Sequence, residues 1–424
     1  MNVSLQTSAE AFLARYEGLR ERLPGDAAIR EAAAASLRRL GLPTQRDEAW
    51  HYTSLRPLGD ASFHEALTEI APRGPACDVL AEDVAPIDAP RLVFTDGRLR
   101  EDLSVLPESV VFRSFADAPD FGSLARADDD PLVALNTMLA EDGAIIEVPE
   151  GVDAGLLLLV SLGADVGGMP VAFHPRHAIR LARGARLTLL EIARGEGPYL
   201  HNPVTEIQVA EGATLTHVRL QDEAPEAFQL ATLYAEVAAE GVYDGFTLNL
   251  GARLCRAEVH ARLAGPGGAA HLNGAQMLRD HQLADITTVV RHDAPGCASR
   301  QTVKTVLAGR SRGVFQGRIE VARAAQKTDG YQMNQALLLS PEAEMDSKPE
   351  LEIFADDVKC SHGATVGELD AEQLFYLRSR GVPEAEARAI LVRAFLAEAF
   401  EPVRHEAVRA LLERAVSGWW SEAA

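Results

Sequence analysis

The pattern of hydrophobic and polar positions divides the chain into three parts. Residues 144–355 form short segments in which apolar and polar residues alternate, and Gly, Pro, Asp or Asn separates one segment from the next. Alternation with a period of two is typical of half-buried β-strands. No compelling helical pattern interrupts this part, so we expect a chain that is mainly β.

A recurring phrase indicates that these strands belong to a repeat. The sequence Gly-Ala-x-Leu occurs at 184–187, 212–215 and 251–254, at offsets of 28 and 39 residues. Strands and glycine turns at loosely constant spacing are typical of a solenoid, in which each repeat buries its apolar face on the next. A β-sandwich would also give many short strands, but the length of the region favours the solenoid.

Helices are expected before this region. Residues 8–40 have helical spacing in two runs, which Gly25-Asp26 separates and 41–43 ends. Residues 91–99 carry an Asp-Gly hairpin signal, and 131–139 read as a short helix. The polar segment 43–53 with its two aromatic residues is either a packed connector, which we favour, or a contact surface.

The C-terminal part also predicts helices. Asp370 and Gln373 have the form of a capping box before the apolar residues 374–377, and we expect Pro383 and Pro402 to open two further helices. These helices should pack on one another, with Trp419-Trp420 as either a clasp on that packing or a partner contact. We therefore divide the chain into a helical and mixed α/β region (1–143), a β core (144–366) and a helical domain (367–424).

Composition narrows the class of protein. The 424 residues include 41 basic and 62 acidic side chains, for a net charge of −21, which argues against nucleic acid and anionic lipid as partners. The four cysteines have no zinc-finger or thioredoxin spacing, and the most apolar run, 155–163, is too short to span a membrane. With no secretory pattern at the N-terminus, we expect a cytoplasmic protein.

Candidate metal ligands lie where the strands give way to helices. Cys360 and His362 stand two residues apart, so in an extended backbone they share one face, about 7 Å from each other. Iron, zinc and copper accept both groups. Two ligands do not fill a coordination shell, and a buried cysteine beside a turn-bonded histidine is the simpler alternative.

Motifs for independent catalysis are missing from the sequence. It contains no P-loop, no G-x-G-x-x-G after a strand, no H-E-x-x-H and no G-x-S-x-G. Carboxylates such as Glu350, Glu352, Asp356 and Asp357 leave open a β-helix enzyme that cleaves polysaccharides. The scattered strand histidines, including His174 and His177, predict no site individually.

Three longer stretches resemble a known family. Residues 347–353 (SKPELEI), 359–367 (KCSHGATVG) and 373–381 (QLFYLRSRG), together with 47–53 (DEAWHYT), resemble the SufB/SufD scaffolds of the SUF iron–sulfur cluster assembly system. SufB-type chains typically have a Glu-His-Glu-Ala-Thr-like stretch where this chain has 360–365, so the resemblance is to the SufD type. Length and domain order fit from end to end.

The resemblance implies a right-handed parallel β-helix in a complex of SufB, SufD and the ATPase SufC. It implies a non-enzymatic scaffold on which a transient cluster forms at the SufB–SufD interface, with His362 as the chief ligand from this chain, Cys360 assisting and a SufB cysteine opposite. The C-terminal helices would dock SufC, and this chain would bind no nucleotide itself. Contact residues there would be Phe375, Tyr376, Phe395, Trp419 and Trp420. A SufB-type scaffold, a purely architectural subunit and a homodimer of the isolated chain remain open.

Overall fold

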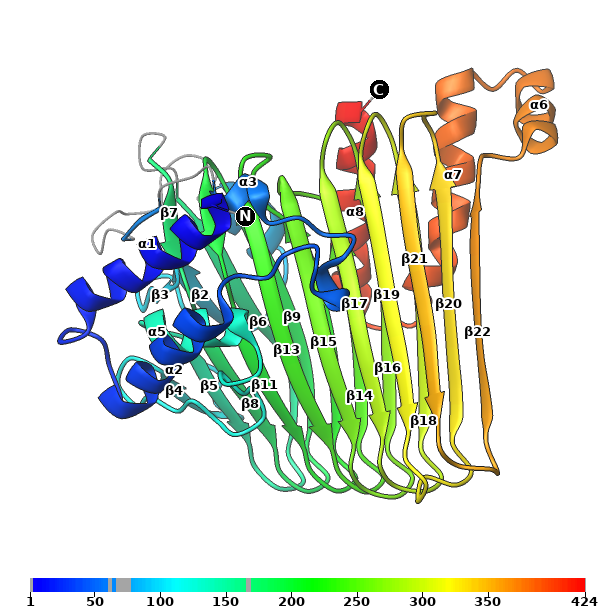
Figure 1. Ribbon diagram of the computed structural model, residues 1–424. Helices are drawn as coiled ribbons and strands as arrows, with labels where there is room; N and C mark the ends of the chain where they lie inside the picture. Colours follow the sequence, from blue (N-terminus) through cyan, green and yellow to red (C-terminus); the bar gives the residue numbers. More distant parts are fainter. Residues whose placement is uncertain (1–2, 60–62, 66–77, 165–168, 424) are drawn as a thin grey trace.

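A two-sheeted parallel β-solenoid of about eight turns forms the centre of the protein (Figure 1). The computed structural model describes residues 3–59, 63–65, 78–164 and 169–423. The chain alternates between sheet A and sheet B, so each strand pairs in parallel with the strand of the previous turn. The prediction of a mainly β solenoid with helices at both ends is confirmed.

Each sheet collects strands from successive turns of the solenoid. In spatial order, sheet A contains β21 (Glu344–Ile353), β19 (Arg312–Val321), β17 (Leu283–His292), β15 (Leu254–Leu263), β13 (Phe228–Val237), β11 (Val204–Val209), β8 (Arg176–Leu181), β5 (Ala144–Val148) and β4 (Val111–Ser114), with β1 (His64–Glu65), β7 (Val171–Phe173) and β10 (Tyr199–His201) beside it. Sheet B contains β22 (Lys359–Gly367), β20 (Asp329–Leu338), β18 (Ala298–Leu307), β16 (Ala269–Leu278), β14 (Val242–Asn249), β12 (Thr214–Asp222), β9 (Arg186–Gly195), β6 (Asp153–Gly163), β2 (Arg91–Thr95) and β3 (Arg98–Leu99).

A left-handed backbone position precedes six successive strands of sheet B. Strands β9 to β22 pair in register at Arg186, Thr214, Val242, Ala269, Ala298, Asp329 and Lys359, a repeat of 27 to 31 residues. Two residues before each of the first six, φ is positive, at Gly184, Gly212, Glu240, Gly267, Gly296 and Lys327. Glycine adopts this conformation without a Cβ clash. The turn that leads into sheet B therefore has the same backbone conformation in these six repeats.

The third Gly-Ala-x-Leu segment, at 251–254, is not equivalent to the first two, so this part of the repeat prediction is wrong. Gly184 and Gly212 occupy equivalent corners, but the next equivalent corner is held by Glu240 with φ of 55°. Gly251-Ala252 instead precedes β15, which belongs to sheet A. The offset of 39 residues thus joins two different corners, because a non-glycine residue hides the true third repeat.

Regions before residue 144 contribute to the same sheets. Asp96-Gly97 makes the predicted hairpin between β2 and β3, and β2 pairs in parallel with β6. Strand β4 pairs with β5. The proposed boundaries at 143/144 and 366/367 stay a prediction.

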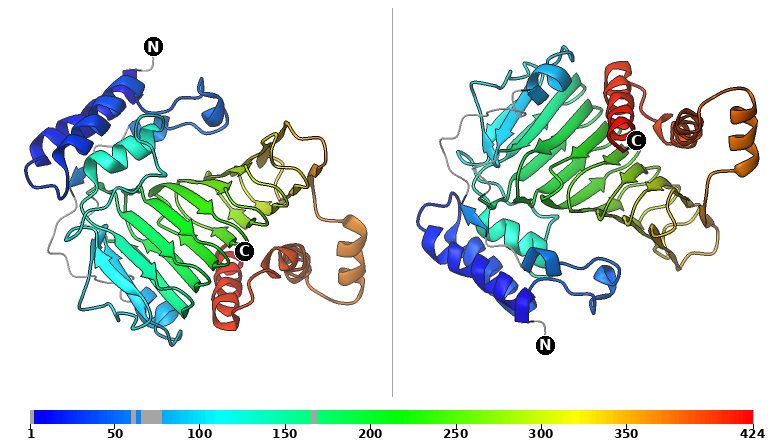
Figure 2. Two further views of the ribbon diagram at one scale, coloured as in Figure 1. Left: turned by 90° about the horizontal axis from the view of Figure 1, so that it is seen from below. Right: turned by 90° about the horizontal axis from the view of Figure 1, so that it is seen from above.

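Helices cover the outside of sheet A near its N-terminal end. The two predicted N-terminal helices are α1 (Val3–Leu19) and α2 (Ala27–Leu40), and the short helix is α5 (Pro131–Leu139). Their buried side chains, such as Phe12 and Leu37, share a core with Phe228 and Leu230 of β13. Figure 2 shows these helices on one side of the solenoid and the C-terminal helices on the other. No helix in the described ranges is long and apolar enough to cross a membrane.

The C-terminal helices begin slightly differently from the prediction. Helix α6 (Ala371–Ser379) is capped by Asp370, whose carboxylate accepts hydrogen bonds from two backbone N–H groups. Pro383 is the N-cap of α7 (Glu384–Phe400) rather than its first residue, and α8 (Glu406–Ala423) begins four residues after Pro402, which lies in the intervening turn. Helices α7 and α8 pack on one another as expected, and both also pack on sheet B.

The connector at 43–53 lies against the outer face of sheet A. It contains the short helix η1 (Glu48–Trp50), and α3 (Arg56–Gly59) follows it. The guanidinium of Arg256 lies 4.0 Å from the ring centroid of buried Trp50, and Gln316 donates a 3.0 Å hydrogen bond to the carbonyl of Ala49. Glu48, at the start of η1, pairs with Lys348 of β21 at 2.8 Å. The segment is therefore a packed connector, as favoured from the sequence.

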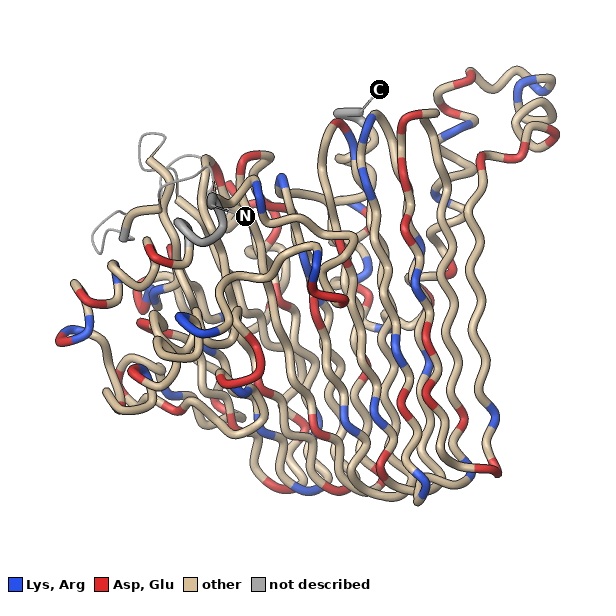
Figure 3. The backbone as a smooth tube through the Cα atoms, in the orientation of Figure 1, with Lys and Arg blue, Asp and Glu red and all other residues tan. Residues whose placement is uncertain are grey.

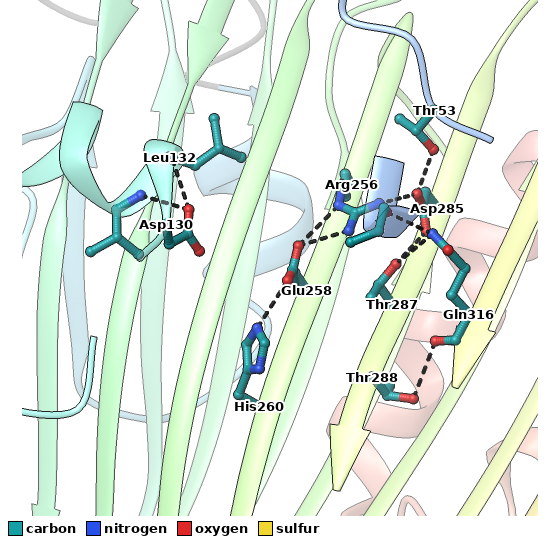
Figure 4. Close-up of polar contacts among 12 residues, drawn as sticks. Thr53, Asp130, Leu132, Arg256, Glu258, His260, Asp285, Thr287, Thr288 and Gln316 are labelled. Atoms are coloured by element: carbon teal, nitrogen blue, oxygen red, sulfur yellow. Dashed lines mark hydrogen bonds and ion pairs between the residues drawn. The ribbon is translucent and has the colours of Figure 1, made fainter. Parts of the chain in front are cut away.

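Buried charges hold this connector in place (Figure 4). Asp285 accepts hydrogen bonds from the hydroxyl groups of Thr53 and Thr287 and from the guanidinium of Arg256. Arg256 also pairs with Glu258 at 2.8 Å. Burial alone would raise the pKa of the Glu258 carboxyl, but Arg256 and His260 bring it below its ordinary value. Each charge is thus compensated by its neighbours.

We expect Arg256→Ala to destabilise the protein by about 3–5 kcal/mol, since it leaves the fully buried carboxylate of Asp285 without its cation. The measurement is the midpoint of urea denaturation. Arg262→Ala is the matched control, because Arg262 also lies on β15 and forms ion pairs but is 54% exposed. That control should change stability by less than about 1 kcal/mol. Equal effects of the two substitutions would contradict the assigned role of the buried network.

Candidate functional site

The predicted ligand pair lies on the last strand of the solenoid. Cys360 and His362 belong to β22, which pairs with β20 on one side and ends the order of sheet B. Strand β21 ends sheet A in the same way. We call this pair of terminal strands the open end. Most residues of β22 are exposed and most of β21 are half-buried, whereas inner positions of β20 such as Gln332 and Asn334 are fully buried.

Strand alternation directs the even-numbered residues of β22 toward the interior. Cys360 packs with Ile319 of β19 and Leu351 of β21, both on sheet A, so its side chain lies between the two sheets. Opposite Cys360, a Cβ on Gly330 would lie 3.3 Å from the Cys360 sulfur, so glycine leaves room for the thiol. His362 occupies the next inner position and is exposed because no further turn covers it. The two-residue spacing thus places both residues on the inner face.

The environment of Cys360 favours a protonated thiol. Burial raises the pKa of this thiol, and the nearby Asp329 carboxylate raises it further, against the effect of the Gly330 backbone N–H. A thiolate is the form that binds metals. Metal binding by Cys360 would therefore require the loss of this proton.

The structure does not complete a coordination shell around this pair. Within the described residues, no group of three or more His, Cys, Asp or Glu side chains is arranged to hold a metal ion. The ligand assignments of Cys360 and His362 stay predictions. A metal site that includes Cys360 and His362 therefore needs further ligands that the described residues do not supply.

A groove of about 730 Å³ lies on the outer face of sheet B beside the open end. Arg300 and Tyr331 stack in adjacent strands with 5.9 Å between guanidinium and ring centroid, and Arg300 pairs with Asp329 at 2.8 Å. Lys359 and Ser361 add to its wall from β22. Lys359 and Ser361 alternate with Cys360 and His362 along β22, and Cys360 also lines the groove.

The aromatic residues predicted to contact a partner have different settings. Phe375 and Tyr376 on α6 are 73% and 57% exposed. Phe395 is partly buried, with the ammonium of Lys304 4.6 Å from its ring centroid. Trp419 is buried among α7, α8 and sheet B, which supports the clasp interpretation for this residue, and Trp420 packs beside it. None of these settings tests a partner role.

Several polar residues that the structure shows in buried networks were not predicted from the sequence. The Arg256 network and the buried amides of Gln301 and Gln332 come from strands far apart in sequence, so no local motif marks them. One feature of the sequence could have indicated them: polar residues occur at alternating strand positions where apolar residues are usual. His174 and His177 are buried as core groups, where burial lowers their pKa to about 3 and about 4.

Thiol alkylation checks the setting of Cys360. In the folded chain, iodoacetamide should modify Cys360 but not the fully buried Cys255 and Cys297, with a pH midpoint above the usual cysteine value of about 8.5. Peptide mass spectrometry after timed labelling gives the rate at each cysteine. A midpoint at or below about 8.5, or earlier modification of Cys255, would contradict this picture. The fourth cysteine, Cys77, lies outside the described residues.

Acidic and basic residues are interspersed along the strands (Figure 3). On the outside of sheet A, for example, Arg262 pairs with Glu236 and Asp293 at 2.9 and 2.7 Å. Near the open end, Arg318 of β19 lies 3.4 Å from Glu350 of β21. The surface around the candidate site is therefore crossed by ion pairs between neighbouring turns.

Comparison with known proteins gives matches along most of the chain. Residues 164–395 match "SUF system FeS cluster assembly, SufBD core domain", and residues 24–156 match "SufBD protein N-terminal region". The iron–sulfur cluster assembly protein SufD of Escherichia coli is 36% identical over 377 residues, covering 88% of each chain.

Two further relatives match over most of the chain. A SufBD family iron–sulfur cluster assembly protein of Synechocystis is 30% identical over 412 residues, which is 92% of this chain and 90% of the relative. The chloroplastic protein ABCI7 of Arabidopsis thaliana is 30% identical over 410 residues, 92% of this chain and 85% of the relative. The chain, with its parallel solenoid and its Cys360–His362 strand, belongs to the SufBD family of the SUF iron–sulfur cluster assembly system.

Proposed function

We propose that this protein is a non-catalytic scaffold subunit of a SufBCD complex. Its open end would contribute His362, with Cys360 assisting, to a nascent iron–sulfur cluster at the interface with SufB. The observation that carries the proposal is the position of an incomplete ligand pair on the inner face of a solenoid end in a SufBD-family chain. A second chain must then supply the remaining ligands.

The open end has the features of an interface between two solenoids. Strands β21 and β22 end their sheets, so each presents an edge of backbone donors and acceptors to which another strand can pair. Apolar side chains accompany these edges, with Ile353 39%, Phe354 68% and Val366 49% exposed. A second SufBD-family chain with the same fold fits this surface, either SufB or a further copy of this chain.

The chemistry of the pair suits a cluster that is assembled and then passed on. Thiolate and imidazole both bind iron in iron–sulfur proteins. A protonated thiol must lose its proton as metal binds, which makes binding by Cys360 dependent on pH. The cluster is cargo in this proposal, and imidazole holds it less tightly than a full set of thiolates.

The C-terminal helices are the proposed docking surface for the ATPase SufC. Helix α6 contains no buried residue and extends beyond the last strands of the solenoid (Figure 1). Helices α7 and α8 are anchored on sheet B through a shared core. A force or rotation applied at α6 can therefore reach the strands beside the cluster site. The sequence has no P-loop, so nucleotide hydrolysis would come from SufC.

We expect His362→Ala to abolish cluster maturation in anaerobic co-expression with SufB and SufC while the complex still assembles. Because His362 is exposed, its loss should change the free energy of unfolding by less than about 0.5 kcal/mol. Iron and sulfide content and the visible absorption of the purified complex give the result.

His281→Ala is the matched control, since it removes another exposed histidine from the turn before β17. It should mature clusters as the wild type does. Full maturation by His362→Ala together with Cys360→Ser would overturn the ligand role and leave the purely architectural subunit as the remaining function.

The double substitution Phe375→Ala/Tyr376→Ala should weaken SufC binding by about tenfold or more without changing the denaturation midpoint, because both rings are exposed. Calorimetric titration of SufC gives the affinity. Trp419→Ala is the contrasting variant and should cost about 3–5 kcal/mol of stability, because Trp419 is buried. Unchanged SufC affinity in the double variant would remove α6 from the docking surface.

A further inference from the structure

We propose that Gln332 is the positioning residue for His362. Its side-chain amide oxygen would accept a hydrogen bond from one ring N–H of His362, so that the other ring nitrogen faces the open end with a free lone pair. This inference rests on the proposed ligand role of His362 and specifies how the chain orients that ligand.

Register places the two side chains next to each other. Gln301 of β18, Gln332 of β20 and His362 of β22 are paired residues in three consecutive strands and all occupy inner positions of sheet B. Adjacent strands are about 4.8 Å apart. The amides of Gln301 and Gln332 and the imidazole of His362 therefore form one column across three strands. Gln332 is the member of this column next to His362.

Gln332 lacks the partners that a buried amide requires. The residue is fully buried, and neither its amide oxygen nor its amide nitrogen has a hydrogen-bond partner among the described residues. An unsatisfied buried polar group is destabilising, and such groups are rare in native proteins. Gln301 differs, because its amide oxygen accepts a 2.6 Å hydrogen bond from the Thr288 hydroxyl.

The opposite sheet keeps the Gln332 amide in the interior. Across from it lies Gly317 of β19, where an added Cβ would be 1.8 Å from the Gln332 amide nitrogen. Because Gly317 has no side chain, the amide of Gln332 can occupy this space. One strand further out, Pro349 pairs with Gly317 and has no polar side chain to compete for the ring of His362.

The chemistry of histidine ligands explains why this bond would matter. A metal-binding imidazole usually donates its second N–H to a carbonyl or carboxylate, which fixes the tautomer and the direction of the ring. His362 is exposed and is paired in register with Gln332 on the neighbouring strand. Loss of such a partner typically lowers metal affinity or activity by about 10- to 100-fold.

The test is the tautomer of His362 in the isolated chain, read from imidazole ¹⁵N chemical shifts after selective histidine labelling and assigned by the signal that His362→Ala removes. Measured at about pH 8, where an ordinary imidazole is neutral, the wild type should show one dominant tautomer. Gln332→Met, which keeps the length but removes the acceptor, should give a mixture, and Gln332→Glu should restore one tautomer. In the SufBCD complex, Gln332→Met should reduce cluster content about tenfold or more.

Gln301→Met is the matched control, since it alters the same column one turn further from His362 and should leave the tautomer unchanged. If Gln332→Met does not fold, as judged by circular dichroism, Gln332→Leu takes its place, with Gln332→Glu as the second variant. An unchanged tautomer in the folded Gln332 variants would overturn the positioning role alone. Full activity of His362→Ala would instead overturn the proposed ligand function, so the two failures are distinguishable.

Discussion

Parallel register between successive turns is the constraint on which the other features of the protein depend. Each strand from β8 to β20 has a neighbour one turn before and one turn after, which satisfies its backbone groups and buries its inner side chains. A solenoid built in this way contacts only its nearest repeats. The last turn has no successor, so β21 and β22 must present both their edges and their inner face. The position of Cys360 and His362 follows from this single fact.

The outer faces of the two sheets are used differently. Sheet A is covered near its start by α1, α2 and α5, and the connector at 43–53 then runs along it to Lys348 of β21. A buried cation at Arg256 secures that connector, at the cost of desolvating several charges. Sheet B instead receives α7 and α8. The open end therefore lies between two sets of elements that are both fixed to the solenoid.

Buried amides occupy inner positions of sheet B in successive turns. Inner positions such as Leu189 and Leu215 are apolar, but Gln221, Asn249, Gln276, Gln301 and Gln332 are buried amides. Aliphatic side chains would bury more apolar surface at these amide positions without leaving polar groups to satisfy. Local departures from the most stable choice occur most often at functional sites. Gln332 is paired in register with His362 on the strand that bears the candidate ligands, which agrees with a functional reason for this amide.

The amino-acid sequence was enough to predict the elements whose cause is local. Alternating apolar positions predicted the strands, Asp96-Gly97 predicted the hairpin and Asp370 predicted the start of α6, because each depends on residues that are close in sequence. The folded chain was needed to establish which corners are equivalent, since Glu240 takes the place of a glycine. It was also needed to show that Trp419 is buried and that Gln332 lies beside His362, because both depend on packing and register across separate strands and helices. Long-range pairing of this kind leaves no signal in a single local segment, and it is what places the candidate site at the open end.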